Sequence, residues 1–366
     1  MKTKNYFRFL LCLLLIIFLF PISNSFAATS TDEIKIDAPV AILMDSNTGK
    51  ILYEKNAYDR MYPASTTKIM TAILALENRD LSHVTKVSYD AIFTVPVGYT
   101  NANLQLDEEL TMEQLLNVLL IPSANDAANV IAEDIGGSVE SFASMMNTKA
   151  VEIGCKGTNF VNANGVHDEN HYSTAYDLAL MGRYAMQNET FRKMVDTVTY
   201  TLPVTNKYDK ADRVFLNTNS LINEKSKQYY EYATGIKTGY TDPAKNCIVA
   251  SAKKDDLELV CVIMGAENTT DSNKFKDCVT LFDFGFENYT YKNLSQKDGV
   301  YKVVTPSNAS NETKNLNILF ENDINALVEK SNYDTEIVPD VELNELKAPI
   351  TKGSVVGKVS YTVLRY

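Results

Sequence analysis

Apolar runs and their spacing divide the chain into regions of different secondary structure. Near the start, two apolar runs, 40–44 and 51–53, flank a turn-rich segment and predict a β-hairpin. In the middle of the chain, apolar residues such as Ile69, Ala72 and Ile73 recur at helical spacing. Short apolar runs return from about residue 235, so strands are expected again there.

Helices are predicted to fill the middle of the chain, and the first begins at Pro63, which suits a first helical position. Thr111 is expected to cap the next one. The remaining predicted helices cover 112–117, 129–134, 141–153 and 175–187. The later strands are predicted at 235–241, 247–252 and 257–264, before a closing helix at 275–286. A sheet built from both ends of this region, with a helical insert, predicts a mixed α/β (α+β) domain.

The remainder of the chain predicts a small all-β domain. After about Tyr291 the apolar runs are short and alternating, and Gly, Pro, Asn and Ser separate them. The predicted strands lie at 300–304, 316–320, 336–343 and 354–364. A length of about 75 residues is compatible with independent folding.

The first 27 residues predict a secretory signal peptide. Lys2, Lys4 and Arg8 precede an unbroken apolar run at 9–20, and small residues surround a cleavage point after Ala27. The run is short for a membrane span, although an uncleaved anchor is the alternative interpretation. We therefore expect three parts: a signal peptide (1–27), a catalytic domain (28–290) and a β-rich domain (291–366). The location is expected to be extracytoplasmic.

Charge and cysteine content exclude some classes of protein. Without the signal peptide, 32 of the 35 Lys and Arg residues remain against 46 Asp and Glu, which is a net charge of −14. Such a chain is not expected to bind nucleic acid. The four remaining cysteines form no C-x-x-C pair, and two of them stand in apolar runs, so we expect buried free thiols.

Three short motifs carry the candidate chemistry: Ser65-Thr66-Thr67-Lys68, Ser123-Ala124-Asn125 and Lys237-Thr238-Gly239. Each is weak alone, and S-x-x-K also occurs at 251–254. Ser65, however, is expected in the first turn of a helix, where free N–H groups favour negative charge. Residues three apart share a helix face, so Lys68 should project beside Ser65.

The motifs occur in the order typical of penicillin-recognising serine enzymes. Over most of 35–290 the chain resembles the low-molecular-mass D-alanyl-D-alanine carboxypeptidases among the penicillin-binding proteins. The segments that carry this resemblance are 62–71, 122–128, 170–177 and 235–242. It implies a serine transpeptidase/β-lactamase-like domain, with an antiparallel sheet and a helical subdomain. It also implies an acyl-enzyme that removes the terminal D-alanine of peptidoglycan stem peptides, acylation by β-lactams, and no cofactor or metal.

The residues themselves indicate which base activates the serine. A serine hydroxyl is a poor nucleophile until a base takes its proton. None of the three histidines is a good candidate for that base, whereas Lys68 can serve if burial or a second cation lowers its pKa. Lys237 is a candidate for the second cation.

The resemblance supplies the other roles. Backbone N–H groups of Ser65 and Tyr240 would bind the oxyanion, and Ser123 would pass a proton to the leaving nitrogen. Asn125 would bind the peptide group of the substrate. The strand with Lys237, Thr238 and Gly239 would also bind substrate, with Thr238 at the terminal carboxylate. Lys274 is the candidate where the family usually has a carboxylate-binding arginine, although lysine lacks the arginine fork.

Two further departures concern the segments around the motifs. After the K-T-G motif this chain has Ala244-Lys245-Asn246 where many relatives have a glycine, so we expect a local loop change. Relatives often end in an amphipathic helix that lies on the membrane. No such helix is predicted before Tyr366, and peripheral association with the membrane or wall stays open.

Three alternatives compete with the carboxypeptidase interpretation. A β-lactamase would need a deacylating glutamate, and no E-x-x-L-N segment lies between Asn125 and Lys237. A zinc carboxypeptidase could use the His167 and His171 pair, but the segment before it is loop-forming and no third ligand is visible. The third alternative is an inactive protein on the same fold that binds or organises peptidoglycan.

Overall fold

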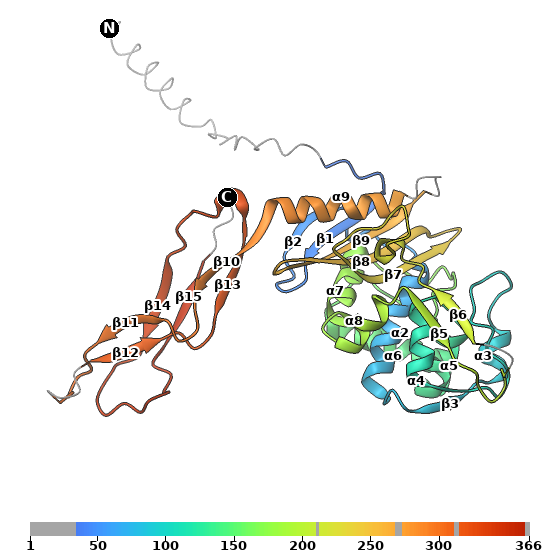
Figure 1. Cartoon of the computed structure of the whole chain (residues 1–366), viewed down its shortest axis with the longest axis horizontal. Coiled ribbons are helices and arrows are strands. Elements are labelled where there is room, and N and C mark those ends of the chain that lie inside the picture. The colour runs from blue at the N-terminus through green and yellow to red at the C-terminus, as the bar shows by residue number, and fades with distance from the viewer. Residues whose placement is uncertain (1–33, 210–211, 268–272, 311–314, 363–366) are drawn as a thin grey trace, which may run out of the picture. The chain divides into compact units, whose positions relative to one another are not determined.

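A computed structural model describes residues 34–209, 212–267, 273–310 and 315–362, and Figure 1 shows their helices and strands. From Ile36 onward the chain forms one compact unit. The predicted signal peptide over 1–27 lies outside the described residues. Within the described ranges, no helix is both long and apolar enough to cross a membrane.

A five-stranded antiparallel sheet forms the centre of the region from β1 to α9. Its order is β2-β1-β9-β8-β7. The strands are β1 (Val40–Asp45), β2 (Ile51–Lys55), β7 (Ala233–Thr241), β8 (Lys245–Lys254) and β9 (Leu257–Ala266). Strands from both ends of the region therefore share one sheet, as the order of the apolar runs predicted. Central strand β9 is buried along its whole length because helices cover both faces of the sheet.

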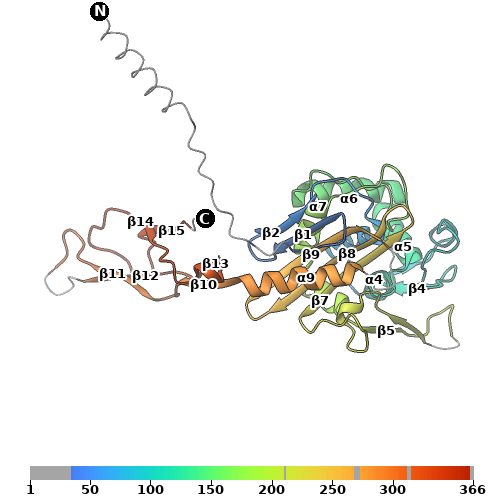
Figure 2. The same cartoon turned by 90° about the horizontal axis from the view of Figure 1, so that it is seen from above.

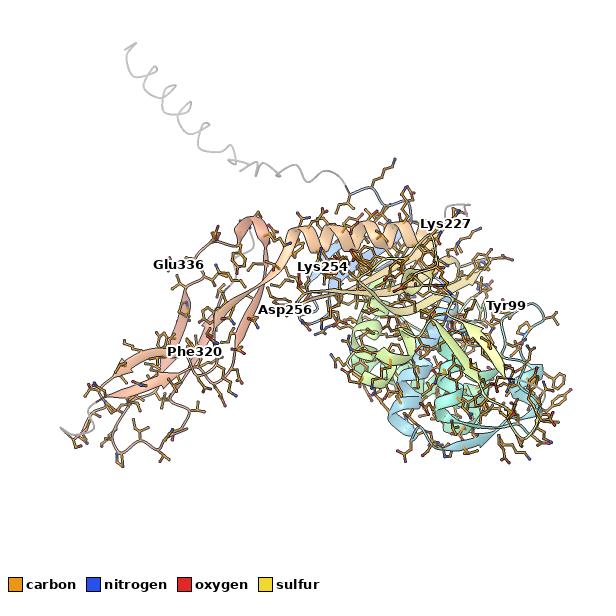
Figure 3. The ribbon with its side chains drawn as sticks, viewed as in Figure 1. Tyr99, Lys227, Lys254, Asp256, Phe320 and Glu336 are labelled. Carbon is orange, nitrogen blue, oxygen red and sulfur yellow. The ribbon has the colours of Figure 1, made fainter. Side chains whose placement is uncertain are left out.

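The hairpin predicted between the two late apolar runs is present. Lys254 pairs with Leu257 across the turn, and Asp255 adopts a left-handed conformation with φ of 53°. An aspartate tolerates that conformation better than most residues. Lys254 and Asp256 mark this turn in Figure 3. The register places Lys237, Thr238 and Gly239 of β7 opposite Val249, Ile248 and Cys247 of β8.

Helices cover both faces of the sheet. They are α2 (Lys68–Asn78), α3 (Tyr89–Phe93), α4 (Met112–Leu120), α5 (Asn125–Gly136), α6 (Val139–Ile153), α7 (Ala175–Ala185), α8 (Glu189–Val195) and α9 (Asn273–Asn288). Figures 1 and 2 show α9 on one face and α7 with the other helices on the opposite face. Ile69, Ala72 and Ile73 are buried as their spacing predicted. Burial of such an isoleucine is worth about 1.5–3 kcal/mol.

The local structure at helix starts refines the predictions. Thr111 caps α4 in a capping box with Gln114, which confirms its predicted role. The predicted α-helical start at Pro63 is wrong in one respect. A 3₁₀ turn, η1 (Ala64–Thr67), comes first, and the α-helix begins at Lys68. Ser65 thus lies in the 3₁₀ turn, which runs directly into α2 and keeps Lys68 three residues away on the same side.

Several short elements connect these helices and strands. They are β3 (Val84–Lys86), β4 (Glu109–Thr111), β5 (Thr199–Leu202), β6 (Arg213–Leu216) and the 3₁₀ turn η2 (Ser220–Ile222). The strands pair locally, β3 with β4 and β5 with β6. None of these short elements was predicted, since strands of three or four residues carry too few positions to show a period.

The C-terminal region is all-β, apart from the single 3₁₀ turn η3 (Lys330–Asn332), among its described residues. Its strands are β10 (Tyr289–Ser295), β11 (Val300–Val304), β12 (Leu316–Leu319), β13 (Ile324–Glu329), β14 (Pro339–Leu343) and β15 (Gly357–Tyr361). They pair as β10 with β13, β11 with β12, and β14 with β15. Ile318, Leu327 and Val328 are its buried apolar side chains in the described ranges, so the buried core of this region is small.

The cysteines have the state that the sequence predicted. Cys155, Cys247, Cys261 and Cys278 are buried and free. The sulfurs of Cys261 and Cys278 lie 3.6 Å apart, between β9 and α9. That distance exceeds the roughly 2.05 Å of a disulfide bond.

Candidate active site

Ser65 lies where three segments of backbone meet. A Cβ atom on Gly239 of β7 would stand 3.0 Å from both the Pro63 oxygen and the Ser65 nitrogen. A Cβ atom on Gly165 would stand 1.9 Å from the Ala64 oxygen, and Gly165 has a φ of 83°. Strand β7 and the loop at Gly165 therefore pack against η1 at distances that only glycine permits. Ser65 is held in a fixed position between them.

Lys68 is fully buried beside this serine. Its Nζ donates to Ser65 Oγ at 2.9 Å, to Asn125 Oδ1 at 2.8 Å and to the Asn164 carbonyl at 2.6 Å. The pKa of Lys68 is held well below its ordinary value, mainly by burial and secondly by the charge of Lys237, while Asp126 offsets part of this effect. The lowered pKa favours the neutral amine, which is in contact with the hydroxyl it would deprotonate.

The S-x-N motif places Asn125 against the lysine. Asn125 is the first residue of α5, and its amide donates to the Thr100 carbonyl at 2.8 Å while its oxygen accepts from Lys68. Ser123 is buried two residues earlier, with a φ of 73°. Ala64, next to Ser65, also has a positive φ, of 49°. Left-handed backbone at non-glycine residues is strained, and such strain clusters at functional sites.

The K-T-G motif contributes a second buried lysine. Lys237 Nζ donates to the Thr238 carbonyl at 3.1 Å, and the Thr238 hydroxyl donates to Thr218 Oγ1 at 2.6 Å. The pKa of Lys237 is lowered to about 7, mainly by burial and secondly by the charge of Lys274. A site with these two lysines is electropositive when they are protonated, which suits an anionic group on a ligand.

Lys274 and Tyr240 lie at the outer part of this group. Lys274 Nζ donates to Asn246 Oδ1 at 3.0 Å, and Asn246 pairs with Tyr240 across β7 and β8. Burial lowers the pKa of Lys274 as well. Tyr240 is exposed, and its hydroxyl donates to Asp242 at 2.9 Å. The structure thus brings Lys274 within electrostatic range of Lys237.

Sequence reasoning missed several residues that hold the site. The Asn164 carbonyl accepts from Lys68, and the Asn164 side-chain amide donates to Asn129 at 3.0 Å. The Asp126 carboxylate accepts from three backbone N–H groups, those of Ala102, Leu104 and Ala127. A backbone carbonyl leaves no mark in a sequence, whereas an aspartate directly after Asn125 could have been suspected of a structural role.

The histidine pair is used for packing. His171 accepts from the Val161 N–H at Nδ1 and contacts Thr67 Oγ1 through Nε2 at 2.8 Å, so both ring nitrogens have partners. Burial lowers the pKa of His171 to about 4. His167 packs edge-on against Tyr62. In the described part of the chain, no three His, Cys, Asp or Glu side chains gather in a way that could hold a metal ion.

The fold is an antiparallel sheet with helices on both faces, and a buried lysine contacts a serine just before the start of α2. These two features together define the class of penicillin-recognising serine enzymes. Two family descriptions match the sequence: D-alanyl-D-alanine carboxypeptidase over residues 26–268, and the C-terminal domain of penicillin-binding protein 5 over 289–364. The chain belongs to the D-alanyl-D-alanine carboxypeptidase family. The predicted family, fold class and serine carboxypeptidase class are thereby confirmed.

Known proteins resemble the chain over most of its length. The D-alanyl-D-alanine carboxypeptidase DacF of Bacillus subtilis (strain 168) is 34% identical and covers 89% of this chain and 82% of the relative. The structure of penicillin binding protein 5 from Haemophilus influenzae is 27% identical, with a TM-score of 0.72 over 90% of this chain and 93% of that one. A peptidoglycan synthesis regulatory factor from Streptococcus pneumoniae is 25% identical, with a TM-score of 0.75 over 89% and 92%.

Proposed function

We propose that this protein removes the terminal D-alanine from peptidoglycan stem peptides through an acyl-enzyme on Ser65, and that penicillins acylate the same residue. The observation that carries the proposal is the contact between Lys68 Nζ and Ser65 Oγ at 2.9 Å, in a setting that lowers the lysine pKa. A neutral amine in contact with a serine hydroxyl is a nucleophile and base pair. Family membership supports the choice of substrate.

In the acylation step, neutral Lys68 takes the proton of Ser65 as the serine oxygen attacks the carbonyl carbon between the two D-alanines. The oxyanion is bound by the backbone N–H groups of Ser65 and Tyr240. The packing of Gly239 against the Ser65 nitrogen supports this role, since β7 runs at contact distance from that group. The carbon–nitrogen bond then breaks, and the leaving nitrogen receives a proton through Ser123.

In the deacylation step, water attacks the ester, gives its proton to the base and releases the shortened peptide with Ser65 restored. Asn125 would bind the substrate's peptide group, while Lys237 and Thr238 would bind its terminal carboxylate. Lys274 is proposed to add a second positive charge for that carboxylate. Its ammonium contributes charge without the two-pronged geometry of an arginine.

Mass spectrometry of residues 28–366 tests this proposal. After incubation with benzylpenicillin we expect a stable adduct on Ser65, and with diacetylated Lys-D-Ala-D-Ala we expect release of D-alanine. Ser65→Ala should abolish both. Ser251→Ala is the matched control, because Ser251 opens the other S-x-x-K segment but is buried in β8 and bonded to Thr234. Its adduct should persist.

Each other result points to a different function. No adduct and no release from folded protein would favour the inactive peptidoglycan-binding protein. Rapid loss of the adduct with hydrolysed penicillin would favour a β-lactamase. Release of D-alanine without an adduct, blocked by a chelator, would favour the zinc mechanism.

We also propose the extracytoplasmic side of the membrane, with the cell wall, as the site of action. The apolar segment at 9–20 supports export, and the substrate class of the family lies outside the membrane. The domain division at 28–290 and 291–366 remains our proposal. Cell fractionation, with N-terminal sequencing of the secreted form, should find Ala28 as the first residue.

A further inference from the structure

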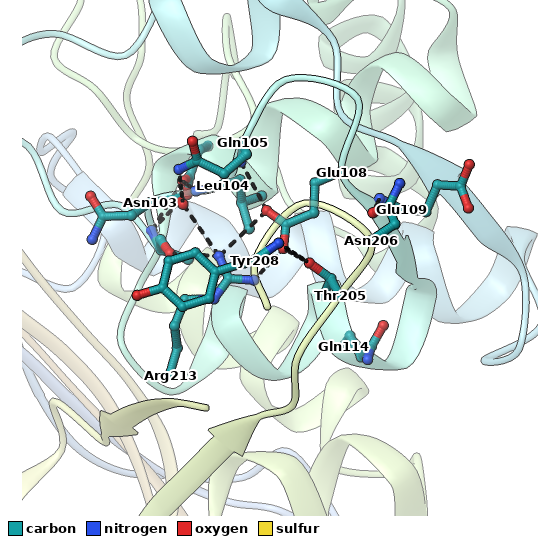
Figure 4. A network of polar contacts seen from close by, with 12 residues as sticks. Asn103, Leu104, Gln105, Glu108, Glu109, Gln114, Thr205, Asn206, Tyr208 and Arg213 are labelled. Carbon is teal, nitrogen blue, oxygen red and sulfur yellow. Dashed lines mark hydrogen bonds and ion pairs between the residues drawn. The ribbon is translucent and has the colours of Figure 1, made fainter. Parts of the chain in front are cut away.

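A buried ion pair lies beside the loop that leads to the active site. Glu108, fully buried, accepts from Arg213 Nη2, and Arg213 is the first residue of β6 (Figure 4). Glu108 also accepts from the Thr205 hydroxyl at 2.6 Å and from the Gln105 N–H at 2.8 Å. The guanidinium stacks over the Tyr208 ring at 4.7 Å. The two charges are therefore paired, hydrogen-bonded and screened from solvent.

The same arginine also holds the segment 100–104. We name this segment the Asn125 loop, because its Thr100 carbonyl binds the Asn125 amide. Arg213 Nη1 donates to the carbonyls of Ala102 and Asn103, at 3.3 and 3.2 Å. The Asp126 carboxylate accepts from the N–H groups of Ala102 and Leu104, at 3.0 and 3.1 Å. Two buried side chains of opposite charge thus fix the loop, one through its carbonyls and one through its N–H groups.

The Asn125 loop in turn fixes the amide that contacts the base. The Thr100 carbonyl accepts from the Asn125 backbone at 3.0 Å and from Asn125 Nδ2 at 2.8 Å. This leaves Oδ1 to accept from Lys68. If the Thr100 carbonyl withdrew, the amide could rotate and present its NH₂ group to the lysine, which would replace an attraction with a repulsion.

We propose that Arg213, paired with Glu108, is a positioning residue for acylation: it holds the Asn125 loop so that Thr100 keeps the Asn125 amide oriented toward Lys68 and the substrate. The inference rests on the proposed function. Arg213 touches neither Ser65 nor Lys68 and acts through the loop alone. No residue of this ion pair belongs to the three motifs.

Exposure explains why the loop needs this support. Thr100, Asn101 and Asn103 are exposed, so water competes for their backbone groups, and only Ala102 and Leu104 are buried. A lysine at 213 would keep the positive charge, but a single ammonium cannot reach a carboxylate and two carbonyls together as the arginine fork does. Arg213→Lys therefore loosens the loop while Glu108 keeps a charged partner.

A double-mutant cycle tests the inference. The second-order rate of acylation by a fluorescent penicillin is measured for the wild type, Arg213→Lys, Asn125→Ala and the double variant. We expect Arg213→Lys to lower the rate about 10-fold, because small misplacements of reacting groups are costly. In the Asn125→Ala background the same change should have no further effect, since the arginine acts through the asparagine. A purely structural role would give the same factor in both backgrounds.

Further variants and outcomes make the result decisive. Glu108→Gln removes the charged partner of Arg213 and should also lower the acylation rate. It replaces Arg213→Lys in the cycle if that variant folds poorly. Arg192→Gln breaks a bidentate pair with Glu258 on another part of the same domain and should leave the rate unchanged. Equal factors in both backgrounds, or a wild-type rate in folded Arg213→Lys, would overturn the inference. An unacylated wild type would instead overturn the proposed function.

Discussion

Gly165→Ala should separate the geometry of the site from the stability of the fold. Gly165 follows Asn164, whose carbonyl accepts from Lys68, and packs against the residue before Ser65. An added Cβ atom would lie 1.9 Å from the Ala64 oxygen and 3.0 Å from the Ser65 nitrogen. Both are backbone atoms, so no side chain can rotate away. The loop and η1 must move apart.

The size of the effect follows from these distances. Real Cβ contacts do not fall below 3.0 Å, so the Ala64 contact must open by about 1 Å. A displacement of that size at reacting groups can cost about 100-fold in rate. The positive φ adds about 1 kcal/mol of strain for alanine. We expect acylation by penicillin to fall about 100-fold in a protein that still folds.

The assay is stopped-flow acylation with a fluorescent penicillin, together with thermal unfolding. Gly154→Ala is the matched control, because Gly154 has a φ of 101° but an added Cβ atom would meet nothing closer than 3.9 Å. It should lose about 2–4 °C in Tm and keep its acylation rate. A folded Gly165→Ala protein that acylates at the wild-type rate would refute the view that Gly165 sets the position of Ser65.

Three further predictions concern the lysines. The acylation rate should rise with pH and level off, with a midpoint well below 10.5, because only neutral Lys68 accepts the proton and burial lowers its pKa; a midpoint near 10.5 would exclude Lys68 as the base. In urea unfolding between pH 7 and 10, the free energy of unfolding of the wild type should rise by about 1.4 kcal/mol per pH unit relative to Lys237→Met. The reason is that folded Lys237, with its pKa lowered to about 7, has released a proton that the unfolded chain still holds. A difference that is constant with pH would contradict this. Lys274→Ala should raise the KM for the tripeptide about 10-fold with little change in kcat, and Lys274→Arg should restore it. An unchanged KM would make Lys274 a structural lysine.

The sequence predicted those features that short-range patterns encode. The contact of Lys68 with Ser65 follows from a separation of three residues, and the burial of Ile69 and Ile73 follows from helical spacing. The predicted start of the α-helix at Pro63 was wrong, because 3₁₀ and α-helical turns place residues three apart in similar ways. The C-terminal strands β10 and β13 were missed because their polar residues, such as Asn293 and Asn325, weaken any alternation.

Contacts between distant segments could not be predicted from spacing. Asn125 meets Lys68 across 57 positions, and this contact was not predicted, since the family resemblance assigned Asn125 only to the peptide group of the substrate. Arg213 meets Glu108 across 105 positions, and nothing around either residue indicates a partner. Both contacts depend on tertiary packing and not on local sequence.

The three lysines explain why this site needs so rigid a frame. Burial lowers the pKa of Lys274, burial and Lys274 lower that of Lys237, and burial and Lys237 lower that of Lys68. At neutral pH each lowered pKa opposes folding, because the unfolded chain holds its protons more readily. A histidine would supply a base near pH 7 without this cost. The lysines stay buried because hydrogen bonds fix them, as those to Asn125 and Asn164 fix Lys68. Loosening one acceptor should therefore reduce catalysis before it unfolds the domain.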